Sequence, residues 1–193
     1  KDDFGIVDER LRDADALHHP FRKLAQLQAP LGADADLVEE PLDALAAVSD
    51  RNAARAEGFA KDFGVERLEV EDVFTHPEID AIVLALPPQY HSEYSIRAME
   101  AGKDVLVEKP IALTVPDAEL AVAAAKRTRR VFMVGHVLRY HPAFEKLLAL
   151  IGAGELGDIK YIHSHRLGLG KFHTENDALW DLAPHDLSMI LAI

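Results

Sequence analysis

The sequence predicts an α/β fold built on a doubly wound parallel sheet. Two observations carry this prediction. Apolar runs at 80–88, 104–110 and 131–135 have the pattern of buried strands, and they alternate with helical patterns at 92–101 and 116–127. Strands that alternate with helices along the chain are typical of a parallel sheet with helices on both faces. A sheet of this kind binds its ligands at the carboxyl ends of the strands.

Each predicted element has a local cause in the sequence. A strand at 43–50 ends in an acid, and an alanine-rich helix at 51–63 has Gly64 beyond its end. Gly102 is a suitable residue just after a helix, while Thr114 and Pro116 suit the start of one. The segment 68–74 leads into a short helical turn before Pro77.

The pattern changes from His136 onward. A helix is predicted at 143–151, then a glycine-rich turn, and then a strand at 159–167 in which apolar and polar residues partly alternate, as in a sheet with one wet face. We therefore predict a domain boundary near His136, after a doubly wound domain over 1–136 in which residues 1–42 are atypical. Residues 137–193 would begin a second domain. Because 186–193 resembles an unfinished helix, we expect this domain to be truncated.

Composition excludes several classes of protein. The 193 residues carry a formal net charge of −12, which argues against nucleic acid or an anionic membrane as a partner. There is no cysteine, which excludes disulfides and thiol chemistry and is compatible with the cytoplasmic location that we predict. No apolar run approaches the roughly 20 residues needed to span a bilayer.

Three polar side chains have a defined place in the predicted fold. Lys109 follows a predicted buried strand, where ligands of such sheets bind. Asp181 and His185 are four residues apart, so a helix would place both on one face. The alternatives are a solvated surface lysine and a helix cap with an incidental neighbour.

A set of ordered motifs resembles one family. The motifs are Ala85-Leu-Pro-Pro88 with His91, Ala101-Gly-Lys-Asp-Val-Leu-Val-Glu-Lys-Pro110, Gly135-His136, Arg139-Tyr140 with Pro142, Gly154-Glu-Leu-Gly157 and Trp180-Asp-Leu-Ala-Pro-His-Asp186. Together they resemble the glucose-fructose oxidoreductase / inositol dehydrogenase / rhizopine catabolism (Gfo/Idh/MocA) family over roughly residues 43 to 193. The last motif is similar to the bacterial branch of nucleotide-sugar 3-dehydrogenases.

The resemblance implies an NAD(P)-dependent oxidoreductase acting on a secondary hydroxyl of a sugar, inositol or nucleotide sugar, and a homo-oligomer. It implies that 1–136 form a Rossmann-like dinucleotide-binding domain. Residues 137–193 would then begin a C-terminal substrate and oligomerisation domain, an α/β unit with an open, largely antiparallel sheet. It implies that Lys109 orients substrate and cofactor, that His185 is the acid/base group, and that Asp181 binds the hydroxyl or assists proton transfer. The implied cofactor-binding residues are Asp50, Arg51, Pro87, His91, Glu108 and Lys109. The implied substrate-binding residues are Lys109, Arg139, Tyr140, Asp181 and His185. Arg139 and Tyr140 could equally cap the interdomain loop, and Trp180 is interpreted as packing.

The Gly-x-Gly-x-x-Gly fingerprint for pyrophosphate is not found in this sequence. The nearest candidate is a strand at 4–7 followed by Asp8, Arg10 and Asp13 in place of the glycines, whose side chains would weaken cofactor binding. This alignment places the loop too far before Asp50, because the ribose-binding acid normally follows about 20 residues on. Residues 14–42 would then hold an insertion or a rearranged first helix.

Asp50 ends its strand as a ribose-binding acid should, which favours NAD, while Arg51 keeps NADP as an alternative. The other interpretation of Asp50 is a helix N-cap. The missing glycines and the abrupt end give a second hypothesis, a catalytically impaired relative or fragment that serves as a binding or regulatory module. No metal site is predicted, because the pairs His18/His19 and His163/His165 each lack a clear third ligand.

Overall fold

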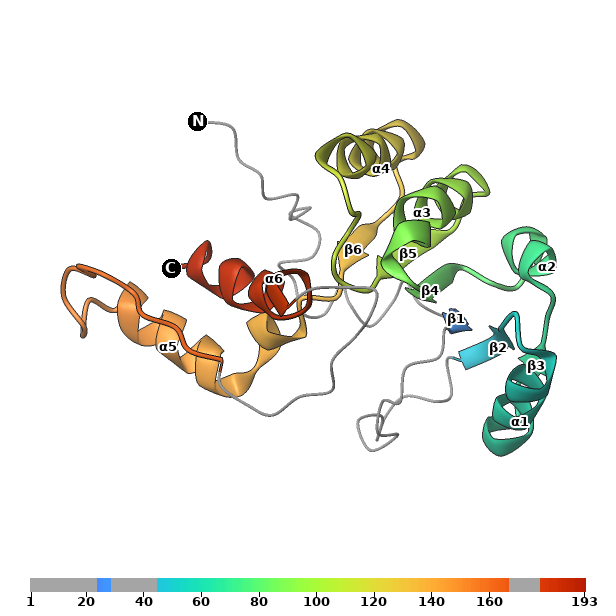
Figure 1. Cartoon of the computed structure of the whole chain (residues 1–193), viewed down its shortest axis with the longest axis horizontal. Helices are drawn as coiled ribbons and strands as arrows, with labels where there is room; N and C mark the ends of the chain where they lie inside the picture. The colour runs from blue at the N-terminus through green and yellow to red at the C-terminus, as the bar shows by residue number, and fades with distance from the viewer. Residues whose placement is uncertain (1–23, 29–44, 167–177) are drawn as a thin grey trace.

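The computed structural model describes residues 24–28, 45–166 and 178–193. Its core is a six-stranded sheet in the order β3-β2-β1-β4-β5-β6, and every neighbouring pair is parallel (Figure 1). The strands are β1 Leu24–Gln28, β2 Leu45–Ser49, β3 Glu66–Arg67, β4 Ala81–Ala85, β5 Asp104–Val107 and β6 Phe132–Val134. This strand order, with the chain reversing direction across the sheet between β1 and β4, is that of dinucleotide-binding folds. The predicted doubly wound parallel sheet is confirmed.

The first strand differs from the prediction. Strand β1 occupies the centre of the sheet, where it pairs with β2 on one side and β4 on the other. The strand predicted at 4–7 lies outside the described residues, and the place assigned to it is taken by Leu24–Gln28. Asp50 follows the end of β1 by about 20 residues, which is the spacing that the fingerprint normally shows. The segment in the position of the phosphate loop is therefore 29–44, also outside the described residues.

Six helices occur in the described part of the chain. They are α1 Ala53–Phe63, α2 Val70–Thr75, α3 His91–Glu100, α4 Val115–Thr128, α5 Pro142–Gly152 and α6 Ala178–Ile190, with 3-10 turns η5 Pro88–Tyr90 and η6 Val137–Tyr140. The side chain of Thr114 accepts a hydrogen bond from the amide of Asp117 at the start of α4, as its N-cap position requires. Gly64 ends α1 with φ of 67°, a conformation that suits glycine.

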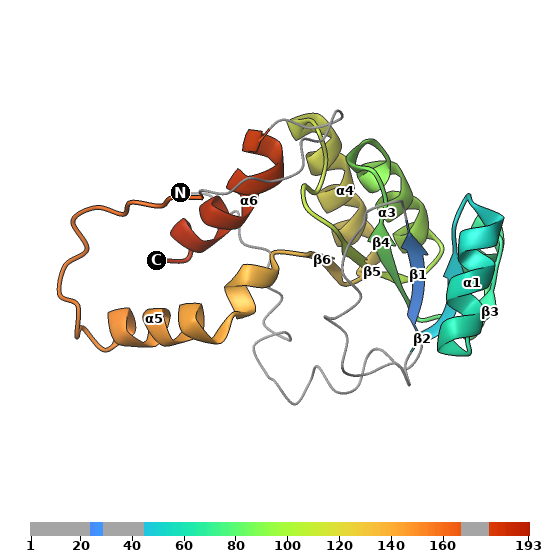
Figure 2. The ribbon, with the colours of Figure 1, turned by 60° about the horizontal axis from the view of Figure 1, so that its bottom comes forward.

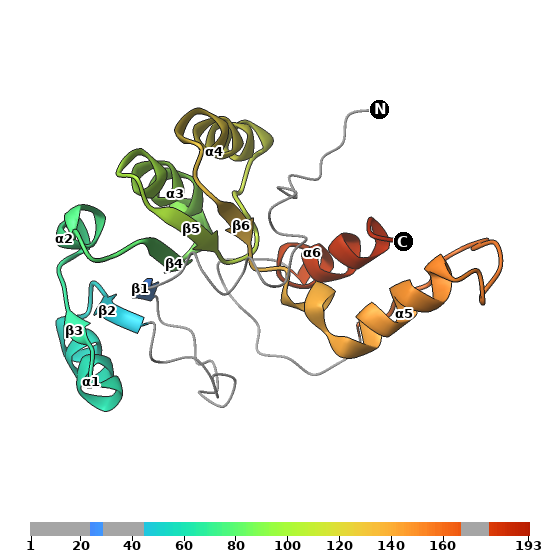
Figure 3. The same ribbon diagram turned by 180° about the vertical axis from the view of Figure 1, so that it is seen from behind.

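The crossovers place helices on both faces of the sheet. Helices α3 and α4 lie side by side, as Figures 1 and 3 show, while α1 lies at the β3 end. Because parallel crossovers are right-handed, α1 packs on the face opposite to α3 and α4. The buried core between these layers is formed by residues of β4, β5, α2, α3 and α4, among them Phe74, Ile82, Leu84, Met99 and Val107.

The chain after β6 leaves the sheet and folds back on itself. Helix α5 projects away from the sheet, and α6 returns to pack on η6 (Figure 2). The strand predicted at 159–167 is wrong over the described residues, because 159–166 form no strand. Partial alternation in the sequence was its basis, but a strand forms only where a neighbouring strand accepts its backbone hydrogen bonds.

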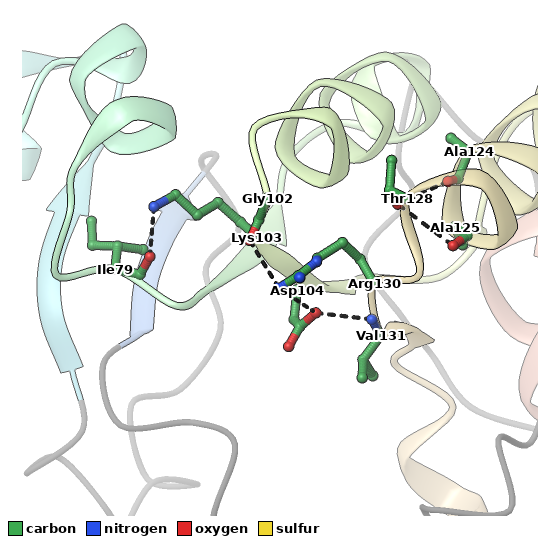
Figure 4. A network of polar contacts seen from close by, with 9 residues as sticks. All are labelled: Ile79, Gly102, Lys103, Asp104, Ala124, Ala125, Thr128, Arg130 and Val131. Atoms are coloured by element: carbon green, nitrogen blue, oxygen red, sulfur yellow. Dashed lines mark hydrogen bonds and ion pairs between the residues drawn. The ribbon is translucent and has the colours of Figure 1, made fainter.

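A polar network stabilises the edge of the sheet where the strands begin. Figure 4 shows Lys103, Asp104 and Arg130 together there, and the Lys103 Nζ donates to the carbonyls of His76 and Ile79 at 2.7 Å each. The Asp104 carboxylate accepts from the amide of Val131 at 2.9 Å. Burial lowers the pKa of Lys103, opposed by the charge of Asp80.

Replacing Lys103 by Met is expected to lower the free energy of unfolding by about 1–3 kcal/mol, because a buried carbonyl and a half-buried one lose their donor. Chemical denaturation followed by circular dichroism measures this. Lys146→Met on the exposed surface of α5 is the matched control, and an equal loss in both variants would contradict the role given to the Lys103 ammonium.

Candidate functional site

The candidate site is the edge of the sheet where the parallel strands end. The backbone there brings together Asp50 after β2, Pro87 after β4, Glu108 and Lys109 after β5, and His136 after β6. Ligands of doubly wound sheets bind outside this edge, near the point where the strand order reverses. All of these positions except His136 were predicted as site residues.

Asp50 is held by an arginine of the following helix. Its Oδ2 accepts from Arg55 Nε at 2.6 Å, and its Oδ1 accepts from the other guanidinium nitrogen at 2.7 Å and from the amide of Asn52 at 2.7 Å. Burial alone would raise the pKa of Asp50, but these hydrogen bonds and the charges of Arg55 and Arg51 lower it overall. Asn52, not Asp50, is the N-cap of α1.

His91 is fully buried and bridges two strand-end loops. Its Nδ1 lies 2.6 Å from the carbonyl oxygen of Pro110, and its Nε2 lies 2.7 Å from that of Leu86. Both ring nitrogens are thus committed to the backbone. His91 can therefore affect a cofactor only indirectly, by holding in place the loops that carry Pro87 and Lys109.

Gly135 allows β5 and β6 to approach each other where they end. A Cβ added there would lie 3.4 Å from the Oε1 of Glu108 and 3.5 Å from the carbonyl oxygen of Val107. The second oxygen of Glu108 accepts from the amide of Lys109 at 3.3 Å. The carboxylate is therefore packed against the backbone between the two strand ends.

His185 and Lys109 come together although they are far apart in sequence. His185 lies in α6, and its pKa is lowered first by burial and then by the charges of Lys109, Arg166 and His136, while Asp186 opposes the shift. A neutral imidazole beside a lysine ammonium can accept a proton from a hydroxyl. Two of the three predicted catalytic residues thus lie within electrostatic range of each other.

Asp181 lies in α6 one turn before His185, and its side chain is outside the described residues. The neighbouring acid, Asp186, is engaged elsewhere, since it accepts from Arg166 Nε at 2.5 Å and from the Ser164 hydroxyl at 3.0 Å. These bonds tie the segment after α5 to α6 and keep the pKa of Asp186 lowered despite burial.

His136 is a member of the cluster that sequence reasoning did not select. Burial and the charge of Arg139 lower its pKa. The Nδ1 atoms of His136 and His185 are both buried and make no hydrogen bond within the described residues. The sequence signal for His136 was its position directly after Gly135, in one of the motifs that resemble the family. Arg139 and Tyr140 are exposed on η6, the turn against which α6 packs.

These residues fit a nicotinamide dinucleotide. An acid after β2 stands where the adenosine ribose binds in such sheets. The buried Nδ1 atoms of His136, after β6, and His185, in α6, lack partners among the described residues, and a polar ligand would satisfy them. The charge of Lys109 acts on His185. Within the described residues no group of three or more metal-ligating side chains occurs, and the neighbouring rings of His163 and His165 have no third ligand there. No described helix combines the length and apolar character needed to cross a membrane.

The sheet order together with this edge is that of the Rossmann fold, which binds a dinucleotide at the carboxyl ends of its strands. The chain belongs to the oxidoreductase family with an NAD-binding Rossmann fold, GFO_IDH_MocA, whose family model matches residues 14–136. The predicted family is confirmed. The match covers all six strands of the described sheet.

Characterised relatives are reductases and dehydrogenases. The chain is 34% identical to scyllo-inositol 2-dehydrogenase (NAD(+)) of Bacillus subtilis, over 58% of this chain and 34% of the relative. It is also 34% identical to dTDP-3,4-didehydro-2,6-dideoxy-alpha-D-glucose 3-reductase of Saccharopolyspora spinosa, over 59% of this chain and 35% of the relative.

One solved structure contains both a cofactor and a nucleotide. It is a mutant 3-ketoreductase from Actinomadura kijaniata in complex with TDP-benzene and NADP, 29% identical with a TM-score of 0.61, and the match covers 72% of this chain and 44% of that one. The chain thus spans about a third of the length of the curated relatives that it matches.

Proposed function

We propose that this chain is the cofactor-binding part of an NAD(P)-dependent oxidoreductase that acts on a secondary hydroxyl of an inositol, a sugar or a nucleotide sugar. The observation that carries the proposal is that Lys109, at the carboxyl edge of the sheet, lies within electrostatic range of His185, whose buried Nδ1 has no partner among the described residues. The inositol and dTDP-sugar activities named for the relatives support this substrate class.

The chain's own residues supply the proton chemistry. When bound, the nicotinamide accepts the hydride from the carbon that carries the hydroxyl. His185, neutral because burial and Lys109 lower its pKa, takes the hydroxyl proton, and the Lys109 ammonium stabilises the charge that develops on oxygen. Asp181 and the exposed pair Arg139 and Tyr140 are proposed to bind the remaining hydroxyls. The homo-oligomer and the cytoplasmic location stay predictions.

A second candidate is a relative that retains the fold without catalysis. The observation that favours it is the segment after β1, where residues 29–44 contain a single glycine, Gly32, in place of the glycine-rich fingerprint. Such a protein would serve as a binding or regulatory module.

Binding of NADH and NADPH separates the two candidates. We expect a rise in melting temperature at millimolar dinucleotide, followed by turnover when inositols and dTDP-sugars are supplied. Glucose-6-phosphate, whose phosphate is not attached to a nucleoside, is a negative control for nonspecific anion binding. A melting temperature unchanged by either dinucleotide would remove the oxidoreductase proposal and leave the binding module.

A further inference from the structure

The arginine that covers Asp50 bears on the choice of cofactor. We propose that Arg55 is a specificity-determining residue, which cancels the charge of Asp50 so that the chain accepts a 2′-phosphate on the adenosine ribose and prefers NADP(H). The inference rests on the proposed function, because it concerns the same dinucleotide site. It departs from the sequence expectation, in which Asp50 alone favoured NAD.

The hydrogen bonds of Asp50 leave little capacity for a ribose. Its carboxylate already accepts two bonds from Arg55 and one from the amide of Asn52, and its side chain is only 2% exposed. A carboxylate has roughly four acceptor positions. A 2′,3′-diol that donates two hydrogen bonds would therefore have to displace Arg55 or Asn52 from one of them.

The charges around Asp50 favour a phosphate instead. The bidentate Arg55 neutralises the carboxylate, and Arg51 adds a second cation on the same edge. Arg51 is exposed, and its guanidinium lies 5.5 Å from the ring centroid of Tyr90, so it stands between the ends of β2 and β4.

Helix α1 adds to the positive electrostatic potential around Asp50. It begins directly after Asn52 and has no acidic residue in its first turn. Its amino-terminal amides therefore contribute positive partial charge that no neighbouring carboxylate cancels. One carboxylate, two guanidinium groups and a helix amino terminus together make a site with a net positive charge, which suits a dianionic 2′-phosphate.

The experiment compares NADH and NADPH binding by calorimetry, without substrate. The wild-type chain is expected to bind NADPH at least about 10-fold more tightly, as a difference of one charge-assisted contact implies. Arg55→Ala exposes the Asp50 charge, so the ratio of the two affinities should shift about 10-fold or more toward NADH. Asp50→Asn should shift it toward NADPH.

Lys61→Ala, which removes one positive charge from the exposed far end of α1, is the matched control and should leave the ratio unchanged. Because Arg55→Ala leaves a buried carboxylate unpaired, its melting temperature is measured first. The double variant Asp50→Asn/Arg55→Ala removes both charges, and it should bind NADPH more tightly than Arg55→Ala does. The nucleotides 5′-AMP and 2′,5′-ADP then test whether the difference resides at the ribose.

Three results would overturn the inference. A wild-type preference for NADH, or a ratio unaffected by Arg55→Ala in a folded variant, overturns it and leaves the proposed oxidoreductase intact. Absence of binding by both dinucleotides overturns the proposed function and this inference together.

Discussion

Replacing His185 by Gln is expected to lower kcat/KM for alcohol oxidation by about 10²–10⁴-fold, the usual contribution of a positioned general base. The reason is the state of the ring. Burial and the charges of Lys109, Arg166 and His136 lower the pKa of His185, so the imidazole is neutral and ready to accept a proton at neutral pH. Glutamine retains a polar side chain of similar reach but cannot take up the proton.

The same lowered pKa fixes the pH dependence. Oxidation requires the neutral ring, so kcat/KM should be constant at neutral pH and fall as the pH drops through the folded-state pKa, below the value of about 6.5 of a free histidine. This acidic limb should be absent from the residual rate of His185→Gln. The control is His141→Gln, an N-cap of the exposed start of α5. A His185→Gln rate within twofold of wild type would exclude His185 as the base.

The free energy of unfolding should also decrease as the pH falls. Because the pKa of His185 is lower in the folded chain than in the unfolded one, the unfolded state binds the proton more tightly. The contribution of His185 to stability is therefore fully present above the unfolded pKa and is lost as the pH falls through the folded one. His136, whose pKa is also lowered by burial and by Arg139, adds in the same sense.

The strands from β4 to β6 could be predicted because all of their residues are buried or half-buried in a sheet with helices on both faces. Such strands appear as continuous apolar runs, and helix signals between them set their spacing. Strand β1 could not be found in this way. Its sequence Leu-Ala-Gln-Leu-Gln is no apolar run, and it is a strand because β2 and β4 pair with it on both sides. The error at 159–167 has the same origin, since alternation was present but no described strand pairs with it.

The candidate site also has features that the sequence predicts and features that it does not. The positions of Asp50, Lys109 and His185 follow from strand ends and helix spacing, which the sequence displays. The partners of these residues do not, because they depend on packing between distant segments. Nothing in the sequence indicates that both nitrogens of His91 bind backbone carbonyls, or that Arg55 covers the Asp50 carboxylate. The cofactor preference depends on the second of these contacts.

Replacing Lys109 by Met is expected to lower kcat/KM by about 10²–10³-fold, the loss that follows removal of one group stabilising a developing oxyanion. A second effect separates this role from a structural one. The Lys109 charge is the largest electrostatic cause of the lowered His185 pKa, so its removal should raise that pKa and move the acidic limb of the rate profile to higher pH.

Lys109→Arg keeps the charge and is the informative control. It should leave the acidic limb near its wild-type position, while the rate stays low because a guanidinium does not reproduce the geometry of the ammonium. NADPH affinity and melting temperature are measured for both variants, so that a loss of folding is recognised. If Lys109→Met lowers the rate but leaves the acidic limb in place, the lysine acts on the substrate without setting the protonation of His185. That result would contradict the second of the two roles proposed for Lys109.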